Sequence, residues 1–453
     1  SCSYAQEGAA NKAENIQTDL VIYNNTAMIK DSYKVSLHKG DGVFKLDNFP
    51  ENIVPESVYI SFDNEPIVIK EQNFQQKAIN QNNILKEYVG KNIKIMNINE
   101  YSGNKEIIDA ELVSIQGGEI YKINNEIYLG YPGYKIVPVV PSELSGTSFL
   151  EWKYFAKKDI EDGLSLYYLS GGLTWKADYI VTLNDNEKTA DIICWATVNN
   201  NTGAAFNNAG LKLVAGSPNV ATPRNMYATR SNKMMMSAEM VSDDIAPMSM
   251  SDYYVYDIPS RTELPVFSSK QIPLINQQNA GIEKEYRITN QRNYYSTSYN
   301  GDAQKNPVSI YVKIINSEKN GLGMPFPAGE MRFYAEEGEQ TFFLGEGNIG
   351  HTPKDEKIEL EVGKAFDVLS ETKQIKFDQI SKNITESSWQ ITISNHKKET
   401  VKVKAIESFQ ADWEITSKNH PYEKLDSNRA AFTAELKPDE TKVIEFTVKT
   451  RFQ

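Results

Sequence analysis

Apolar and polar side chains alternate through the middle of the chain. From residue 173 to residue 183 every odd position is apolar, and Ile180 is the one apolar exception among the even positions. A period of two places alternate side chains on opposite faces, so the pattern predicts a β-strand with one buried face. After a polar turn at 184–187, two further alternating segments follow; their apolar positions are Ala190, Ile192, Cys194, Ala196, Val198, Leu211, Leu213 and Ala215. Together the segments predict an antiparallel meander within 164–215.

Short strand signals separated by tight turns fill the chain before this meander. Residues 19–80 contain an alternating stretch that ends in a Gly-containing turn at 38–42, which predicts a hairpin in a small β domain. Residues 84–141 hold four or five short apolar stretches joined by Gly-Gly and Asn-Asn turns. Because closure removes exposed strand edges, many short strands with tight turns favour a small β-barrel here.

The C-terminal part shows the most regular alternation, as at Trp389, Ile391 and Ile393. Strands at this spacing indicate an immunoglobulin-like β-sandwich, here without the cysteine pair that links the two sheets of such domains. The sequence therefore predicts an all-β, multi-domain protein with antiparallel meanders, a small β-barrel and a C-terminal immunoglobulin-like sandwich. The expected parts are a polar N-terminal arm (1–18), a small β domain (19–80), the barrel (84–141), a central β domain (146–364) and the sandwich (365–453).

The alternation breaks off between residues 216 and 262, a segment that holds seven of the eleven methionines. A loop of this length inside a compact domain is functional or disordered. The methionines are Met226, Met234, Met235, Met236, Met240, Met248 and Met250. Thioethers can bind Cu(I), but no His or Cys joins them, so we favour a loop that packs on a sheet or on a neighbouring subunit.

The charge balance limits the classes of partner. The chain has 60 acidic and 48 basic residues, a net charge of −12. Each contact with a phosphate would oppose the field of the whole chain, which argues against nucleic acid and anionic lipid as partners. No run of 18 apolar residues occurs, so we expect no transmembrane helix.

The opening stretch and the two cysteines bear on location. The polar opening resembles the extension that follows a removed signal peptide, which predicts a secreted or cell-surface protein. A lipid anchor on Cys2 is not favoured, because cleavage before a lipidated cysteine would have removed Ser1. Cys194 lies on an apolar strand face and is expected to be a buried, unreactive thiol. A disulfide between Cys2 and Cys194 and a free Cys2 both stay open.

Motifs for catalysis are missing. The histidines, at positions 38, 351, 396 and 420, have no metal-binding spacing, and no GxSxG, phosphate-loop or CxxC motif occurs. The residues around Asp185 fit a solvated hairpin turn better than a calcium loop. A pair of carboxylates for glycoside hydrolysis would meet only in the fold and leaves no mark in the sequence. We therefore expect no cofactor, no metal and no catalysis.

Trp195 is the candidate interaction residue outside the Met-rich segment. The strand period places its side chain opposite those of Cys194 and Val198. A tryptophan on this second face needs either another packed layer or a binding partner.

Several stretches together resemble a known family. They are GLTWKADYIVTL, WATVNNNTGAAFNNAGLKLVAGSP, PFPAGEMRFY, LGEGNIGHTPKDEKIELEVGKAFDV, ISNHKKETVKVKAIES and the closing Trp413. In this order they resemble a secreted bacterial family of a domain of unknown function that is found beside mucoidy inhibitor A-like proteins. The resemblance runs from about residue 160 to the C-terminus, and residues 19–62 resemble the small N-terminal β domain of the family. It implies a short form, with the barrel where some relatives carry a coiled coil, and no established activity.

These observations favour an extracellular or cell-surface structural protein without catalytic activity. Its copies are expected to form a homo-oligomer or polymer, such as a filament, sheath or surface layer. The contacts would come from the N-terminal arm, the sheet edges and the Met-rich segment, because strand edges are ready for strand addition. A monomeric module that binds an envelope glycan or protein is the alternative, and a hydrolase with a carboxylate site ranks third.

Overall fold

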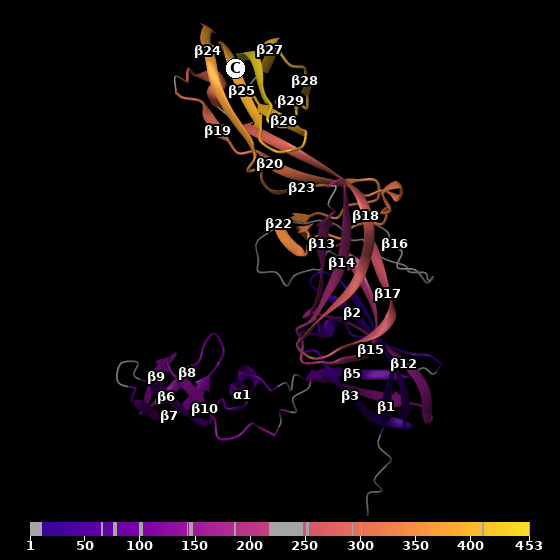
Figure 1. Cartoon of the computed structure of the whole chain (residues 1–453). Coiled ribbons are helices and arrows are strands. Elements are labelled where there is room, and N and C mark those ends of the chain that lie inside the picture. The colour runs from indigo at the N-terminus through magenta and orange to yellow at the C-terminus, as the bar shows by residue number, and fades with distance from the viewer. Residues whose placement is uncertain are drawn as a thin grey trace, which may run out of the picture. The chain divides into compact units, whose positions relative to one another are not determined.

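The computed structural model shows a chain built almost entirely of strands (Figure 1). It describes residues 11–64, 67–75, 79–98, 103–142, 144, 148–184, 187–216, 248–250, 253–291, 293–299, 301–409 and 412–452. Of this part of the chain 68% is strand and 4% is helix, which confirms the predicted all-β class. The described residues divide into two compact units, the first made of 1–175 and 198–270 and the second of 176–197 and 271–453.

The first unit contains a sheet, here called the β1 sheet, in which distant parts of the chain are neighbours. Its strand order is β16 (Met248–Met250), β17 (Tyr253–Leu264), β15 (Phe206–Ala215), β1 (Lys12–Ile22), β2 (Ala27–Leu37), β12 (Ile160–Ser170) and β4 (Tyr59–Phe62). β1 pairs antiparallel with β2 and parallel with β15. The register of β1 against β2 shifts between Asn15 and Gln17, which marks a β-bulge.

A second sheet of this unit, the β11 sheet, has the order β3 (Gly40–Phe49), β11 (Ser148–Ala156) and β5 (Val68–Gln75). Its buried face is aromatic: the rings of Phe44 and Trp152 stack with their centroids 4.9 Å apart, and Tyr154 packs edge-on against Phe44. A short 3₁₀ turn, η1 (Pro55–Ser57), leads into β4. Aromatic contacts of this kind stabilise the pairing of β3 with β11.

The predicted small β-barrel is wrong: the segment forms an open sheet, the β6 sheet. Its strand order is β10 (Tyr134–Ile136), β6 (Asn92–Ile98), β7 (Lys105–Ser114), β8 (Ile120–Ile123) and β9 (Glu126–Leu129), and among the described residues no pairing joins β9 to β10. Its buried residues lie on one face, where helix α1 (Gln81–Glu87) packs Leu85 against Ile93 and Ile95. The helix completes the core, so the sheet does not need to close on itself.

The second unit contains a long sheet, the β13 sheet, whose strands begin near the middle of the chain. Its order is β22 (Gln340–Ile349), β21 (Gly329–Glu337), β13 (Leu173–Leu183), β14 (Thr189–Asn200), β18 (Ser268–Gln291), β26 (Val401–Ser408), β29 (Arg429–Leu436) and β28 (Tyr422–Lys424). β20 (Ser309–Ile315) pairs with β18 and with β23 (Lys357–Lys364), and the short 3₁₀ turns η2 (Asn293–Ser296) and η3 (Glu318–Asn320) lie in the connections.

The alternation in β13 and β14 is confirmed, but the predicted meander is wrong at its third strand. Every odd position of β13 and every even position of β14 from Ala190 is buried. β14 lies beside β18, however, whereas β15 lies in the β1 sheet between β1 and β17. The period determines which face of a strand is buried, but the same period is compatible with any partner strand.

The C-terminal part forms two packed sheets, and their immunoglobulin-like character stays a prediction. The β25 sheet, with the order β19 (Gln304–Asn306), β24 (Val368–Ser381), β25 (Ile384–Asn395), β30 (Thr441–Arg451) and β27 (Asp412–Lys418), packs on the part of the β13 sheet formed by β18, β26 and β29. Trp389, Phe432 and Phe446 lie in the shared core. This core also takes Tyr286 and Tyr295 from chain segments before residue 365, and β18 pairs parallel with β26.

A fully buried asparagine ends a strand at three places in the described residues. They are Asn200 at the end of β14, Asn316 directly after β20 and Asn395 at the end of β25, each with 0% exposure. Each side-chain amide donates to three backbone carbonyls, and each side-chain oxygen accepts a backbone N–H from the following loop. The same hydrogen-bond pattern therefore fixes the loops at three strand ends, because one side-chain amide can form hydrogen bonds with four backbone groups.

Candidate functional site

The structure describes only some of the predicted interaction residues. Trp195 is half-buried on β14, on the face opposite the fully buried Cys194 and Val198, as the period predicts. Burial raises the pKa of the Cys194 thiol to about 12, so the thiol is protonated and unreactive at neutral pH. Cys2 and the polar residues 1–10 lie outside the described residues.

Most of the Met-rich segment lies outside the described residues. Met226, Met234, Met235, Met236 and Met240 lie outside the described residues. Met248 and Met250 lie in β16, at one edge of the β1 sheet, where β16 pairs with β17. Within the described part of the chain no group of three or more His, Cys, Asp or Glu side chains could hold a metal ion.

A polar hollow of about 410 Å³ opens in the first unit, and we call it the Asp31 pocket. β1, β2, β12, the end of β3 and the start of β15 supply its walls. Its polar lining consists of the amides Asn15, Gln17, Asn48, Asn207 and Asn208, the carboxylates Asp31 and Asp47, and the hydroxyls of Thr18, Tyr33 and Tyr168. Ile16 and the side chain of Phe206 supply apolar surface.

Asp31 is the buried acid of this pocket, with 5% of its surface exposed. Its carboxylate accepts hydrogen bonds from the hydroxyls of Thr18 and Tyr168 (3.0 Å for Tyr168) and from the Asn15 amide at 3.4 Å. Burial raises the pKa of the Asp31 carboxyl, and these three hydrogen bonds only partly oppose the shift. The site thus holds an acid that ionises less readily than an exposed aspartate.

Unusual backbone geometry surrounds the same pocket. The bulge between Asn15 and Gln17 locally interrupts the ladder of β1 and β2. Asn48 and Asn208, which also line the pocket, both have left-handed backbone conformations, with φ of 69° and 47°. Such features gather at binding sites, where they aim side chains that regular strands would direct elsewhere.

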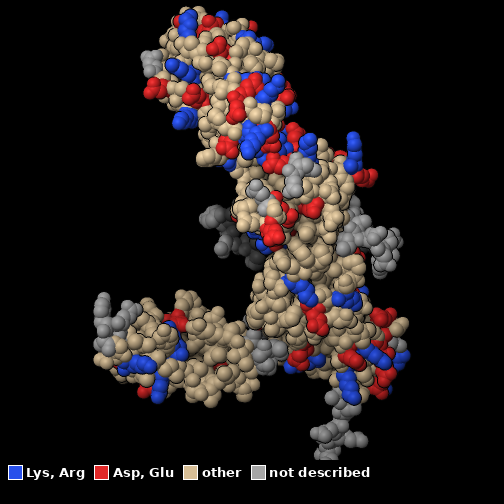
Figure 2. Space-filling model, in the orientation of Figure 1, with Lys and Arg blue, Asp and Glu red and all other residues tan. Residues whose placement is uncertain are grey.

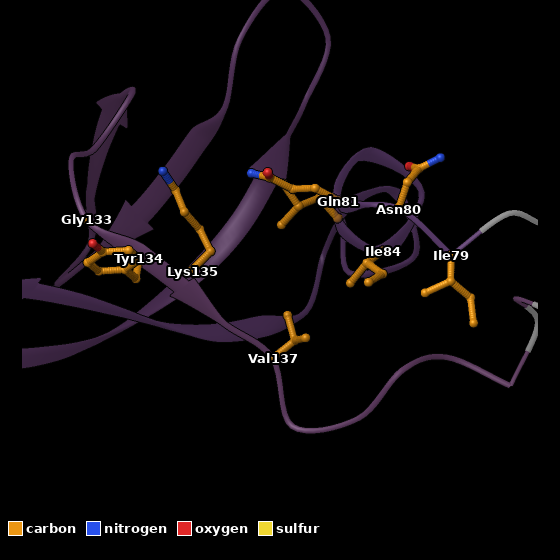
Figure 3. A pocket seen from close by; sticks show the side chains of 9 residues that line it. Ile79, Asn80, Gln81, Ile84, Gly133, Tyr134, Lys135 and Val137 are labelled. Carbon is orange, nitrogen blue, oxygen red and sulfur yellow. The ribbon is translucent and has the colours of Figure 1, made fainter. Parts of the chain in front are cut away.

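A second hollow, of about 560 Å³, lies between α1 and β10, and we call it the α1 groove (Figure 3). Ile79, Asn80, Gln81 and Ile84 line it from the helix side, and Tyr134, Lys135 and Val137 line it from the β10 side (Figure 3). Helix α1 begins here because the Asn80 side chain accepts the backbone N–H of Asn83 at 2.8 Å.

β10 is an edge strand of the β6 sheet in the described structure, paired with β6. Its one charged residue, Lys135, forms a 2.9 Å ion pair with Glu119, which also accepts the Tyr121 hydroxyl. Burial disfavours the Glu119 carboxylate, but the hydrogen bonds from Tyr121 and Lys135 outweigh burial and lower its pKa. The lysine that could guard this edge is therefore engaged inside its own module.

β22 forms an edge of the β13 sheet and carries a row of exposed apolar side chains. Phe342, Phe343 and Leu344 are 45%, 56% and 36% exposed. The Phe343 ring packs edge-on against Tyr334 of β21, with 5.6 Å between ring centroids. An apolar edge of this kind is unusual on a monomeric protein, because edge strands normally carry charges that prevent strand addition.

Charges of both signs are intermingled on the face drawn in Figure 2, rather than gathered in a basic tract. The face of the β6 sheet module drawn there carries few charged side chains. Within the described residues no helix is long and apolar enough to cross a membrane.

The sequence departs from simple alternation at residues of the Asp31 pocket and of the β22 row. Asp31 stands at an inward position of β2, between Ile29 and Tyr33, where an apolar residue is expected. Phe342, Phe343 and Leu344 form an unbroken apolar run, which cannot be buried on one face of a strand. A buried acid and a run of adjacent apolar residues both depart from a simple alternating strand, and both mark the surfaces described above.

Comparison with known proteins bears on the second half of the chain. A family model described as a domain of unknown function (DUF4139) matches residues 164–453. This range agrees with the resemblance seen from about residue 160 onward. No curated protein matches the chain.

Proposed function

The chain belongs to the family of the domain of unknown function DUF4139, and from that premise we propose that it is a structural protein of the bacterial cell surface whose copies associate with one another. Secretion, the relation to mucoidy inhibitor A-like proteins and the absence of catalysis belong to this proposal. The observation that carries it is the exposed apolar row of β22, together with the edge strand β10 beside the α1 groove.

The proposed contact is heterologous: the β21–β22 hairpin of one copy adds to β10 of a second copy. An added strand would pair with the free backbone groups of β10, as in other cases of recognition by strand addition. Because successive side chains of a strand point to opposite faces, one of Phe342 and Phe343 would face the α1 groove while the other faces away. Burying one phenylalanine side chain contributes about 1.5–3 kcal/mol.

Shape and charge both support this pairing of surfaces. The hairpin carries exposed apolar side chains, and the groove is concave with Ile79, Ile84 and Val137 in its lining. The β21–β22 hairpin bears the exposed acids Glu336 and Glu339 at or near its turn, whereas β6, the neighbour of β10, bears the exposed Lys94. Opposite charges favour one orientation of the added strand.

A contact between two different surfaces of identical copies does not stop at a dimer. Each copy keeps one free hairpin and one free groove, so the contact produces an open chain of copies unless the rotation closes a ring. This geometry is the reason that we propose a filament, sheath or surface layer rather than a discrete dimer.

The test is the oligomeric state of three variants at increasing protein concentration, followed by light scattering and negative-stain electron microscopy. The double variant Phe342→Lys with Phe343→Lys, and the single variant Ile79→Lys, each place a charge in the proposed contact and should abolish assembly. Phe366→Lys is the matched control, because Phe366 is 90% exposed between β23 and β24 and lies outside both surfaces. Monodisperse monomers of the unmodified chain at high concentration, or equal loss of assembly in the control, would contradict the proposal.

A further inference from the structure

The geometry of the Asp31 pocket points to a function separate from self-association: we infer that it binds a neutral, hydroxyl-rich saccharide. The pocket belongs to the first unit, whereas the apolar row of β22 belongs to the second. Its volume of about 410 Å³ lies within the range of roughly 300–1,000 Å³ that is typical of small-molecule sites.

The lining chemistry selects the class of ligand. A sugar hydroxyl is both a donor and an acceptor, and side-chain amides can serve it in both roles. Among the described residues that line the pocket, five are Asn or Gln, two are Asp, and none is Lys or Arg. Without a cationic side chain the pocket would repel a phosphate or carboxylate ligand, so an anionic ligand is disfavoured.

Asp31 would only lower the stability of the fold if its role were purely structural. It occupies an inward position on β2, and its hydrogen-bond donors Thr18, Tyr168 and Asn15 are all neutral. A buried carboxylate without a cationic partner lowers stability, and an apolar residue would follow the pattern of its strand. A carboxylate has about four acceptor positions, so three hydrogen bonds leave capacity for a ligand hydroxyl.

Two asparagines with positive φ angles support the same inference. Asn48 and Asn208 hold positive φ angles that glycine would adopt at lower cost, yet both present an exposed amide at the pocket. The Asn48 amide also donates to the carbonyl of Ala205 at 3.3 Å, which ties the end of β3 to the start of β15 across the pocket. The two amides thus lie on separate segments that converge on one hollow.

The experiment is binding to an array of neutral oligosaccharides built from hexoses and N-acetylhexosamines, followed by calorimetric titration of the bound oligosaccharide. The double variant Asn48→Gly with Asn208→Gly removes both amides and keeps a backbone that accepts positive φ. We expect it to weaken binding at least tenfold. The matched control is Asn124→Gly, which replaces another asparagine of positive φ (49°) in the turn between β8 and β9, and it should bind as the unmodified chain does.

A second variant, Asp31→Asn, keeps the size of the side chain and should weaken binding by a similar factor, with its folding checked by thermal unfolding. No binding to any oligosaccharide on the array, binding by the double variant equal to that of the unmodified chain, or binding that requires added calcium would overturn the inference. The double variant Phe342→Lys with Phe343→Lys separates the two proposals, because it leaves every residue of the pocket in place and should retain full binding.

Discussion

The buried asparagine at the end of β25 offers a strong test of what holds the sandwich together. The Asn395 amide donates to the carbonyls of Glu399, Leu436 and Lys437 at 2.8, 3.2 and 3.0 Å, and its side-chain oxygen accepts the Lys397 N–H at 3.0 Å. The substitution Asn395→Ala removes all four partners at once. It leaves four backbone groups of two loops, which are buried or partly buried at these contacts, without the Asn395 partner.

The magnitude follows from that count of partners. A buried hydrogen bond contributes about 1 kcal/mol net, so the loss of four predicts a destabilisation of about 4 kcal/mol. A change of this size is exceptional for one substitution of a polar residue. The substitution Asn395→Asp keeps the acceptor but turns a carboxylate toward three carbonyl oxygens, so its effect should be at least as large at neutral pH and smaller in acid.

Hydrogen exchange of peptides from β25 and β30 measures the opening of this sandwich separately from the rest of the chain. The control is Asn419→Ala, because Asn419 also bonds backbone groups of the same sheet, the carbonyl of Val443 and the N–H of Glu445, but is exposed. Its loss should cost less than about 1 kcal/mol, since water replaces the lost partners. If Asn395→Ala destabilises the sandwich no more than this control does, the reasoning from buried partners is refuted.

Further predictions concern the buried thiol, the buried acid and a close backbone approach. Burial raises the pKa of the Cys194 thiol to about 12. A chain with Cys2 replaced by Ser should therefore resist thiol reagents at pH 8 in the folded state and react promptly in concentrated urea. Fast labelling of the folded chain would contradict this prediction. Asp31 has a raised pKa in the folded state, so the folded state binds the carboxyl proton more tightly than the unfolded state does. Stability therefore falls as the pH rises from the ordinary pKa of aspartate through the raised pKa. Asp31→Asn should remove this part of the pH dependence of the melting temperature, and an unchanged pH profile in that variant would contradict the prediction. At Gly329 an added Cβ would lie 2.1 Å from a backbone carbonyl oxygen of β13, so Gly329→Ala should destabilise by about 1–3 kcal/mol, whereas Gly350→Ala, which meets nothing within 4 Å, should be close to neutral in the same urea titration.

The proposed self-association and the proposed saccharide binding are compatible in one protein. An assembly that presents many copies of the Asp31 pocket would bind a polymeric glycan more tightly than one copy does, because the second binding event is intramolecular. Loss of assembly should therefore reduce binding to a long glycan while leaving binding to a short oligosaccharide unchanged.

Local pattern determined much of the secondary structure. The period of two in β13 and β14 predicted which side chains are buried, and the regular alternation near Trp389 predicted the sandwich. It also predicted a buried Cys194, because the strand period alone assigns that residue to the inward face. These features depend on neighbours in the sequence, and the sequence carries them directly.

Only the tertiary structure decided which strands are neighbours and where the hollows lie. β15 follows β14 in the chain but lies beside β1, and helix α1 covers the sheet that short strands and tight turns had suggested would close into a barrel. The Asp31 pocket joins residues near 15, 31, 48 and 208, which no local pattern connects. The physical reason is that alternation reports burial of one face, whereas pairing and cavities depend on contacts between segments far apart in the chain, and many pairings satisfy the same alternation.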